Sequence, residues 1–361
     1  MAQVFHLTGT LRGTDLSDVW VADGRIHHRA PAVNDAREIS ELSGFIYPGL
    51  VDAHHHPGMS HSAEPVSDAQ MLRRLEICRA NGVTFIRDAG GQRNAGAVCG
   101  TGLPKVIYAG QHIARFKRYT RYLAVEVEPD DFVAEVQRQA RAGTGWVKIV
   151  ADWIDRSLPE PDLAPLWPAD ILRDGVQAAH DLGAKVMVHT FAAQTVRSVL
   201  DAGVDCIEHG TGMDAEQMVE ARERGILLDP TVFQVNRFPE FAAAGARFPL
   251  YQRRMLEMHE RLDERLEQMV QAKSLFVMGT DTAENVAERP LPVELVTAVD
   301  HGMPPSVVMK AASYGGRQLL GLSAWEDGAA ADFVVYGSDP ELDIQQVLHP
   351  QAVLIDGILT Q

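Results

Sequence analysis

The sequence predicts an α/β fold, in which a TIM-like (β/α)8 barrel is joined to a small β-sandwich domain composed of both chain ends. Two observations lead to this prediction. The middle of the chain alternates short apolar runs with longer runs of helical spacing, which is typical of a parallel sheet with crossover helices. Both ends instead carry short β-prone runs separated by turns. With 361 residues, 46% of them hydrophobic, the chain is long enough for a barrel of roughly 250 residues and a smaller second unit.

The two chain ends have the same pattern of short β-prone runs separated by turns. Near the start, short β-prone runs flank the turn Ala22-Asp23-Gly24, and near the end a run is followed by the turn Asp356-Gly357. A few isolated strands bury too little surface to be stable, so we expect the two ends to complete one another. The predicted small domain comprises residues 1–47 and 322–361, and the predicted barrel comprises residues 48–321.

Eight strand-like runs follow one another along the barrel segment, separated by runs of helical spacing. Helices are expected over 68–80 and 168–182, and a helical arm over 249–273 between the last two strands. Methionines at helical spacing in that arm are expected to pack rather than to bind a cofactor. The predicted strands are 45–53, 83–87, 105–109, 146–150, 185–188, 204–207, 226–228 and 275–278.

Charge and cysteine content narrow the function classes. The net charge of −16 disfavours binding to nucleic acid or to an anionic membrane surface. No run approaches the length of a membrane span and the first residues lack a secretory leader pattern, so we expect a cytoplasmic protein that acts on a small molecule or a peptide. A homo-oligomer is compatible with this composition. Cys78, Cys99 and Cys206 are widely spaced and are expected to be free thiols.

Two histidines end the first predicted barrel strand. Alternate residues of a strand share a face, so His54 and His56 would point to the same side and His55 to the other. Neutral imidazole is a common metal ligand, although a histidine triplet alone could be a chance surface cluster. Further candidate ligands end four later strands, and barrel chemistry lies at that end of the strands. These candidates are Lys148, His189, His209 and Asp281.

The order of these candidate ligands along the chain resembles that of the amidohydrolase superfamily of metal-dependent hydrolases. Residues 188–190, 202–210 and 279–281 are most similar to its Xaa-Pro dipeptidase and imidazolonepropionase-like branches. The resemblance implies about two Zn²⁺ per chain and a Lys148 carboxylated by carbon dioxide, whose carbamate bridges both ions. By the same resemblance His54, His56 and Asp281 hold the first ion, and His189 and His209 hold the second. The alternative is an unmodified Lys148 in a salt bridge beside a single metal.

Asp281 has a second implied role in this resemblance. Besides binding metal, it would act as the general base that takes a proton from a metal-activated water and passes it to the leaving nitrogen. The predicted reaction is hydrolysis of a carbon–nitrogen bond in a peptide, a cyclic amide or an acylated amine. The plainer alternative for Asp281 is that it caps the turn after the last strand.

A basic and aromatic segment follows the third predicted strand. Residues 115–122 contain four cations and three aromatic residues in an otherwise acidic chain. Loops after barrel strands line the active-site face, so this segment could bind a substrate carboxylate or an acidic peptide tail. It could equally be solvated surface. Trp153, just after the fourth strand, is expected to pack as a core residue at the rim of the barrel. The candidate substrate-binding residues are His112, which could polarise a carbonyl, together with Arg115, Lys117, Arg118, Tyr119 and Arg121.

Several functions fit this pattern. The favoured one is a binuclear zinc hydrolase with a dipeptidase-like substrate. A more specialised alternative is a hydrolase that removes a C-terminal segment from a peptide natural-product precursor. A mononuclear deaminase would need an acid near His189, where the sequence has Thr190 and Phe191. A noncatalytic metal-binding barrel is the alternative from another class, which the full set of ligand-type residues disfavours.

Overall fold

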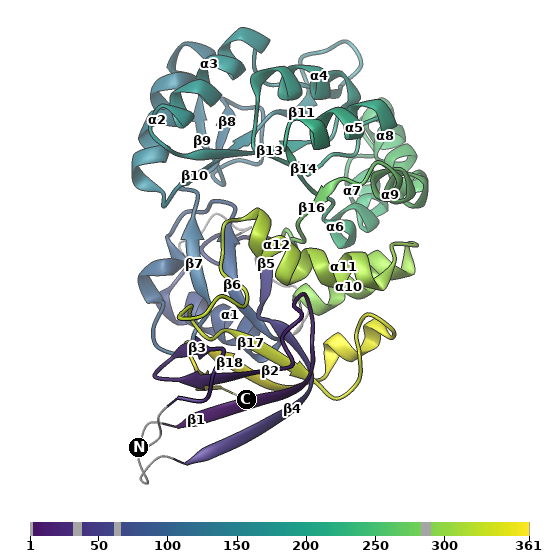
Figure 1. Cartoon of the computed structure of the whole chain (residues 1–361). Coiled ribbons are helices and arrows are strands. Elements are labelled where there is room, and N and C mark those ends of the chain that lie inside the picture. The colour runs from purple at the N-terminus through teal and green to yellow at the C-terminus, as the bar shows by residue number, and fades with distance from the viewer. Residues whose placement is uncertain (1–2, 32–37, 61–65, 283–289, 361) are drawn as a thin grey trace.

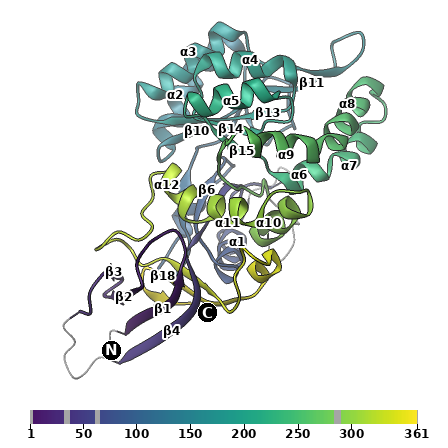
Figure 2. The ribbon, with the colours of Figure 1, turned by 45° about the vertical axis from the view of Figure 1, so that its right-hand side comes forward.

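The computed structural model describes residues 3–31, 38–60, 66–282 and 290–360. Figure 1 shows a sheet made from the chain ends at one end of the molecule, with the parallel strands and most helices beyond it. Turning the molecule, as in Figure 2, keeps these two parts separate. Within the described residues, no helix has both the length and the apolar character needed to cross a membrane.

Strands from both termini form one mixed, seven-stranded sheet in the order β19-β18-β17-β4-β1-β2-β3. The two ends meet where β17 runs antiparallel to β4, with Val335 opposite Ile46. Apolar side chains from both ends, such as Phe5 and Phe333, share one buried core. This pairing confirms that the β unit is composite, whereas its sandwich form and domain limits stay predictions. The strands are β1 (Val4–Leu11), β2 (Asp18–Ala22), β3 (Arg25–His27), β4 (Ile39–Pro48), β17 (Phe333–Tyr336), β18 (Pro350–Ile355) and β19 (Ile358–Leu359).

The first predicted barrel strand, 45–53, is wrong as a single strand. Its first part belongs to β4 of the terminal sheet, and the parallel strands begin with β5 (Leu50–His55). The chain changes sheets at Pro48-Gly49. Proline has no N–H to donate to a sheet, and a Cβ on Gly49 would lie 2.2 Å from side-chain atoms of Thr84. The apolar pattern runs through this point because both strands are buried.

The parallel strands form two groups, β5-β6-β7 and β16-β15-β14-β13-β10-β8-β9. The groups meet where the N–H of Ala53 donates to the carbonyl of Met278 and that of His56 to the carbonyl of Thr282, both at 2.8 Å. This order fits an α/β, TIM-like barrel, and its complete closure stays a prediction. The short strands β8 and β9, in and after the basic segment, were not predicted. The remaining strands are β6 (Val83–Asp88), β7 (Lys105–Tyr108), β8 (Ile113–Arg115), β9 (Val125–Val127), β10 (Trp146–Val150), β13 (Lys185–Thr190), β14 (Cys206–His209), β15 (Leu227–Asp229) and β16 (Leu275–Phe276).

The helices follow the predicted positions, with one correction. The first begins as predicted, because Ser67 and Gln70 form a reciprocal capping box. The predicted arm 249–273 is two helices that meet at Arg261, and its Met255 and Met269 are buried packing residues. The helices are α1 (Asp68–Ala80), α2 (Phe132–Ala142), α3 (Ala169–His180), α4 (Ala193–Ala202), α5 (Ala215–Glu223), α6 (Val232–Asn236), α7 (Phe238–Ala244), α8 (Pro249–Glu260), α9 (Leu262–Gln271), α10 (Pro290–Asp300), α11 (Pro305–Ala312) and α12 (Tyr314–Leu319).

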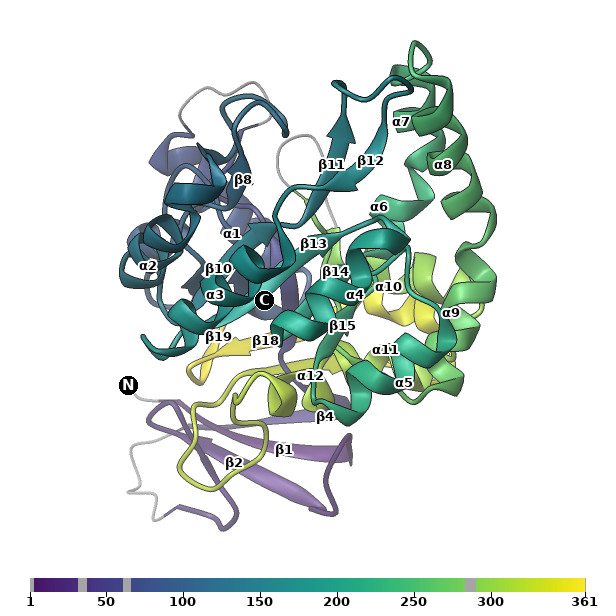
Figure 3. The same cartoon turned by 90° about the horizontal axis from the view of Figure 1, so that it is seen from above.

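A hairpin missing from the sequence prediction rises beside the barrel strands. It consists of β11 (Asp152–Asp155) and β12 (Asp162–Pro165), which pair in antiparallel fashion. Seen from above, the hairpin projects next to α7 and α8 (Figure 3). An ion pair of 3.3 Å between Arg254 of α8 and Asp162 of β12 joins the two elements. Hairpin and helices therefore form one wall above the barrel strands.

A histidine in the terminal sheet gives a testable pH effect on stability. The ring of His6 stacks on Trp20 and lies 2.8 Å from Asp18 Oδ2 and 3.0 Å from Glu41 Oε1. Burial lowers the pKa of His6, but these carboxylates outweigh it and the net shift is upward. The stabilisation is therefore complete below the unfolded-state pKa and is lost as pH rises through the folded-state pKa. We expect His6→Asn to cost more stability at about pH 5.5 than at about pH 9, by less than about 1 kcal/mol because the contacts are near the surface.

The measurement is the free energy of unfolding by urea at both pH values. The double variant Asp18→Asn/Glu41→Gln should remove the pH dependence of the His6→Asn effect. An effect of equal size at both pH values would show that the stacked ring, rather than its charge, provides the stabilisation.

Candidate metal centre

A cavity of about 530 Å³ lies at the C-terminal ends of the parallel strands, and all six predicted metal ligands line it. They come from five different strands or the segments that follow them, and β5 contributes two. These strand ends meet because parallel strands carry their C-terminal ends on one side of the sheet. His54 and His56 come from the end of β5, Lys148 from β10, His189 from β13, His209 from β14 and Asp281 from the segment after β16.

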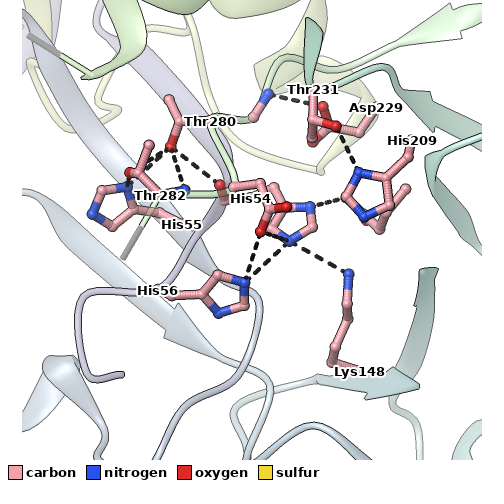
Figure 4. A network of polar contacts seen from close by, with 12 residues as sticks. His54, His55, His56, Lys148, His209, Asp229, Thr231, Thr280 and Thr282 are labelled. Atoms are coloured by element: carbon pink, nitrogen blue, oxygen red, sulfur yellow. Dashed lines mark hydrogen bonds and ion pairs between the residues drawn. The ribbon is translucent and has the colours of Figure 1, made fainter. Parts of the chain in front are cut away.

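His54, His56 and Asp281 form a compact group that could hold a metal ion. The Nε2 atoms of both histidines lie 3.2 Å from Asp281 Oδ1 and 3.2 Å from each other (Figure 4). His56 Nδ1 lies 2.6 Å from the carbonyl of Gly90, an acceptor only, so Nδ1 carries the hydrogen and Nε2 presents its lone pair to the group. The Asp281 carboxylate, the lone pair of His56 Nε2 and the Nε2 of His54 all point at one spot. These groups repel one another unless a proton or a cation lies between them.

The pKa shifts of His54, His56 and Asp281 also indicate that this group favours a positive charge. Burial and the Lys148 ammonium lower the pKa of His54, but Asp281 and Glu208 raise it, with a net rise to about 9. Burial lowers the pKa of His56. Burial also raises the pKa of Asp281, yet the contacts with His54 and His56 hold it below its ordinary value. These shifts favour a protonated His54 beside an ionised Asp281, so this spot favours positive charge.

Lys148 lies beside this group. Its Nζ is 3.5 Å from His54 Nε2, and the side chain is buried. Burial lowers the pKa of Lys148 from its ordinary value, opposed by the carboxylates of Glu208 and Asp281. The amine is therefore closer to its neutral form than a surface lysine would be.

His189 and His209 approach from the other side of the cavity. Their ring centroids are 4.7 Å apart, and the ring of His209 lies 5.5 Å from that of His54. Burial lowers the pKa of both, that of His209 to about 3, so both are neutral imidazoles near pH 7. His209 Nδ1 lies 2.6 Å from Thr231 Oγ1, whereas the buried Nε2 of His189 has no hydrogen-bond partner within the described part of the chain. That orphaned nitrogen fits a metal ligand better than a structural histidine.

Two of these residues have strained backbones. His209 has a φ of 66° and Asp281 a φ of 49°, a region that non-glycine residues rarely adopt. The strain at Asp281 is held by its N–H, which donates to the carbonyl of His54 at 2.7 Å. Such strain is typical of functional sites, where the fold fixes a side chain in a required direction.

Sequence analysis missed the buried residues that support the histidines. His54 Nδ1 lies 2.6 Å from Glu208 Oε2, and Arg87 donates to Glu208 Oε1 at 3.0 Å. All three side chains are almost fully buried. The signal available in the sequence was an acid within the apolar strand that ends in His209. His55 faces away from the cavity, toward Asp52, as its alternation in the strand predicts.

The basic segment is only partly directed at the cavity. His112, Tyr119 and Arg121 line it, whereas Arg115, Lys117 and Arg118 do not. The predicted substrate-binding set is therefore only partly at the cavity, and the cationic groups of the last three have other partners. Arg115 lies 3.5 Å from Glu128, Lys117 lies over the ring of Phe116, and Arg118 pairs with Asp155 at 2.8 Å.

Trp153 was expected to be core, but it lines the cavity. Its ring centroid lies 4.7 Å from that of Tyr119 and 5.4 Å from that of His189. Asp152 is buried beneath it and accepts hydrogen bonds from the N–H groups of Phe191 and Ala192. The cavity wall beside the histidines is therefore aromatic.

Comparison with known proteins gives the family. The model of the amidohydrolase family matches residues 45–359. An uncharacterised protein of Mycobacterium tuberculosis is 35% identical over 354 residues, which cover 96% of this chain and 94% of that protein. Ochratoxinase of Aspergillus niger is 27% identical over 237 residues, which cover 62% of this chain and 48% of the relative.

Among solved structures, a Xaa-Pro dipeptidase with methionine bound in its active site matches 100% of both chains, with a TM-score of 0.81 and 22% identity. The structure of A. niger ochratoxinase matches 100% of this chain and 96% of the other, with a TM-score of 0.78 and 21% identity. At such identities the likeness shows the fold. Together with the family match, it shows that the chain belongs to the amidohydrolase family and is a hydrolase that acts on carbon–nitrogen bonds.

Proposed function

We propose that this chain is a binuclear zinc hydrolase that cleaves an amide bond in a small, peptide-like substrate with a free carboxylate. The observation that carries the proposal is the convergence of ring nitrogens and the Asp281 carboxylate on one buried spot, with the Lys148 amine and two further neutral histidines beside it. Bound there, zinc would polarise the substrate carbonyl and activate water.

The residues present fit two ions. His54, His56 and Asp281 would hold one, and His189 and His209 the other. Lys148 would bridge both after its amine adds carbon dioxide, a reaction that requires the neutral amine favoured by burial. As an ammonium group it would instead repel both ions. Asp281 would accept the proton of the attacking water and deliver it to the leaving nitrogen.

The rest of the cavity suits a small amide. Both ring nitrogens of His112 are buried without a hydrogen-bond partner among the described residues, and burial holds its pKa well below the ordinary value. A neutral His112 can donate an N–H to a substrate carbonyl. The aromatic wall of Tyr119, Trp153 and Phe191 offers apolar contact to the rest of the substrate.

Metal analysis tests the centre. We expect the protein purified with zinc to hold about two ions per chain, and His189→Ala to lose most of the second ion and most activity while it stays folded. The matched control is His112→Ala, which removes another buried imidazole of the same cavity and should keep both ions. One ion in the wild type would contradict the bridging role of Lys148, and a fully loaded, fully active His189→Ala protein would show that His189 is not a ligand.

The substrate class is tested by turnover. The zinc-loaded protein should cleave members of a panel of dipeptides and N-acyl amino acids faster than cyclic amides. Release of a C-terminal segment from longer peptides, without turnover of dipeptides, would favour the specialised maturation enzyme instead. Release of ammonia from amino-heterocycles would favour a deaminase.

A further inference from the structure

Two arginines of the cavity lie in loops that the basic segment does not include. Arg156 lies in the turn between β11 and β12, and Arg247 lies between α7 and α8. Their guanidinium carbons are 5.8 Å and 4.7 Å from the ring centroid of one residue, Phe248. We call Arg156 and Arg247 the arginine pair. Residues from two separate elements thus place two cations around a single ring (Figure 3 shows the elements).

The arginine pair has no anionic partner within the part of the chain that the structure describes. No carboxylate there lies within 4.0 Å of either guanidinium group. The acids nearest in the hairpin sequence are engaged elsewhere, Asp155 with Arg118 and Asp162 with Arg254. The net charge of the chain is −16, so acids are abundant, yet none of the described ones pairs with Arg156 or Arg247. Two like charges beside one ring repel each other, and a bound anion would relieve that repulsion.

The position of the pair sets the part of the substrate that it would meet. The metal-ligand histidines are buried, whereas Arg156 and Arg247 are exposed, and both groups line the same cavity. One end of the cavity is therefore the reaction centre and the other a cationic mouth. Apolar side chains such as Phe241 and Tyr251 line the same cavity. The Phe248 ring lies beside both guanidinium groups, which are the side chains best suited to bind an oxyanion.

We propose that the arginine pair binds an oxyanion, a carboxylate or a phosphate, carried by the substrate at a distance from the bond that is cut. The inference rests on the proposed amide hydrolysis and deepens it. The enzyme would then prefer amphipathic amides with a second anionic group over simple dipeptides. The two guanidinium groups would act together, as two arms of one anion site.

The test compares matched probes on the zinc-loaded full chain. The first pair is N-benzoylglycyl-glutamate and N-benzoylglycyl-glutamine, the second is succinyl- and acetyl-phenylalanyl-glycine, and the third is N-benzoylglycyl-O-phosphoserine and N-benzoylglycyl-serine. The members of each pair differ in one anionic group. The value of kcat/KM is measured for probes that are cleaved, and Kd by calorimetry for those that are not.

We expect at least one anionic probe to be preferred by about tenfold or more over its neutral partner, and less so in high salt. The double variant Arg156→Gln/Arg247→Gln should reduce that preference to about twofold or less. Arg253→Gln is the matched control, since Arg253 is an exposed arginine of α8 that pairs with Glu257 outside the cavity. The pair that shows the preference tells carboxylate from phosphate.

The outcomes separate the two proposals. A preference seen only in Kd, with no probe cleaved, contradicts the proposed hydrolysis of such amides and supports the arginine pair. Cleavage with no preference in any pair, or a preference that the double variant retains, overturns the role of the arginine pair and leaves the hydrolase proposal in place.

Discussion

Asp281→Asn is expected to lower kcat/KM by about 10³-fold or more and to leave the fold intact, because general base catalysis alone contributes about 10²–10⁴. The carboxylate oxygen Oδ1 lies 3.2 Å from the Nε2 atoms of both His54 and His56, at the spot where a metal would be held. Its lowered pKa keeps it ionised near neutral pH. An amide has nearly the same shape, yet it is a weaker ligand and cannot take the proton. The variant should therefore lose turnover and part of its zinc.

Steady-state kinetics and metal analysis check this, with the thermal midpoint as the measure of folding. Asp263→Asn is the matched control, because Asp263 is an exposed acid of α9 that pairs with His301 on the surface. It should keep full activity. Turnover of Asp281→Asn near that of the wild type, with both ions in place, would remove the proton-transfer role from this carboxylate.

Much of the fold could be predicted because local patterns carry it. Residues 68–80 form a helix in the structure as in the prediction, since their apolar spacing and the Ser67 cap act within a few residues. The prediction of a single strand over residues 45–53 was wrong because strand pairing depends on residues far away in the sequence. An apolar run shows that a segment is buried, but not which strand lies beside it, and here the two halves pair with different sheets.

The same distinction applies to the site. The candidate ligands were predictable, because a barrel brings the C-terminal ends of its strands together and His54, His189 and His209 lie at such ends. The contacts of the arginines Arg118 and Arg156 could not be predicted. Arg118 was predicted to meet substrate, but it pairs with Asp155 of a hairpin that the sequence did not reveal, and the same hairpin brings Arg156 to the cavity. Loop contacts depend on long-range packing, to which composition gives no guide.

Glu208→Leu is expected to destabilise the protein by about 3–5 kcal/mol, the usual cost of leaving one partner of a buried ion pair alone. Arg87 and Glu208 are both fully buried and 3.0 Å apart. Burial would raise the pKa of Glu208, but Arg87 and His54 hold it well below the ordinary value, so the carboxylate is charged. Without it, the guanidinium of Arg87 keeps Asp229 at 3.9 Å as its nearest acid. His54 also loses the acceptor that fixes its ring, so zinc affinity should fall by about 10–100-fold.

Urea unfolding and a zinc-chelator competition measure the two effects, and two further variants separate them. Arg87→Met/Glu208→Leu removes both charges and should recover most of the lost stability, because an apolar pair of similar volume can replace a buried ion pair. It should not recover zinc affinity, since His54 still lacks its acceptor. Glu208→Gln keeps an acceptor for His54 and should bind zinc more tightly than Glu208→Leu. Full recovery of zinc affinity in the double variant would mean that Glu208 serves the metal centre only through stability, and that the 2.6 Å contact with His54 does not position the ligand.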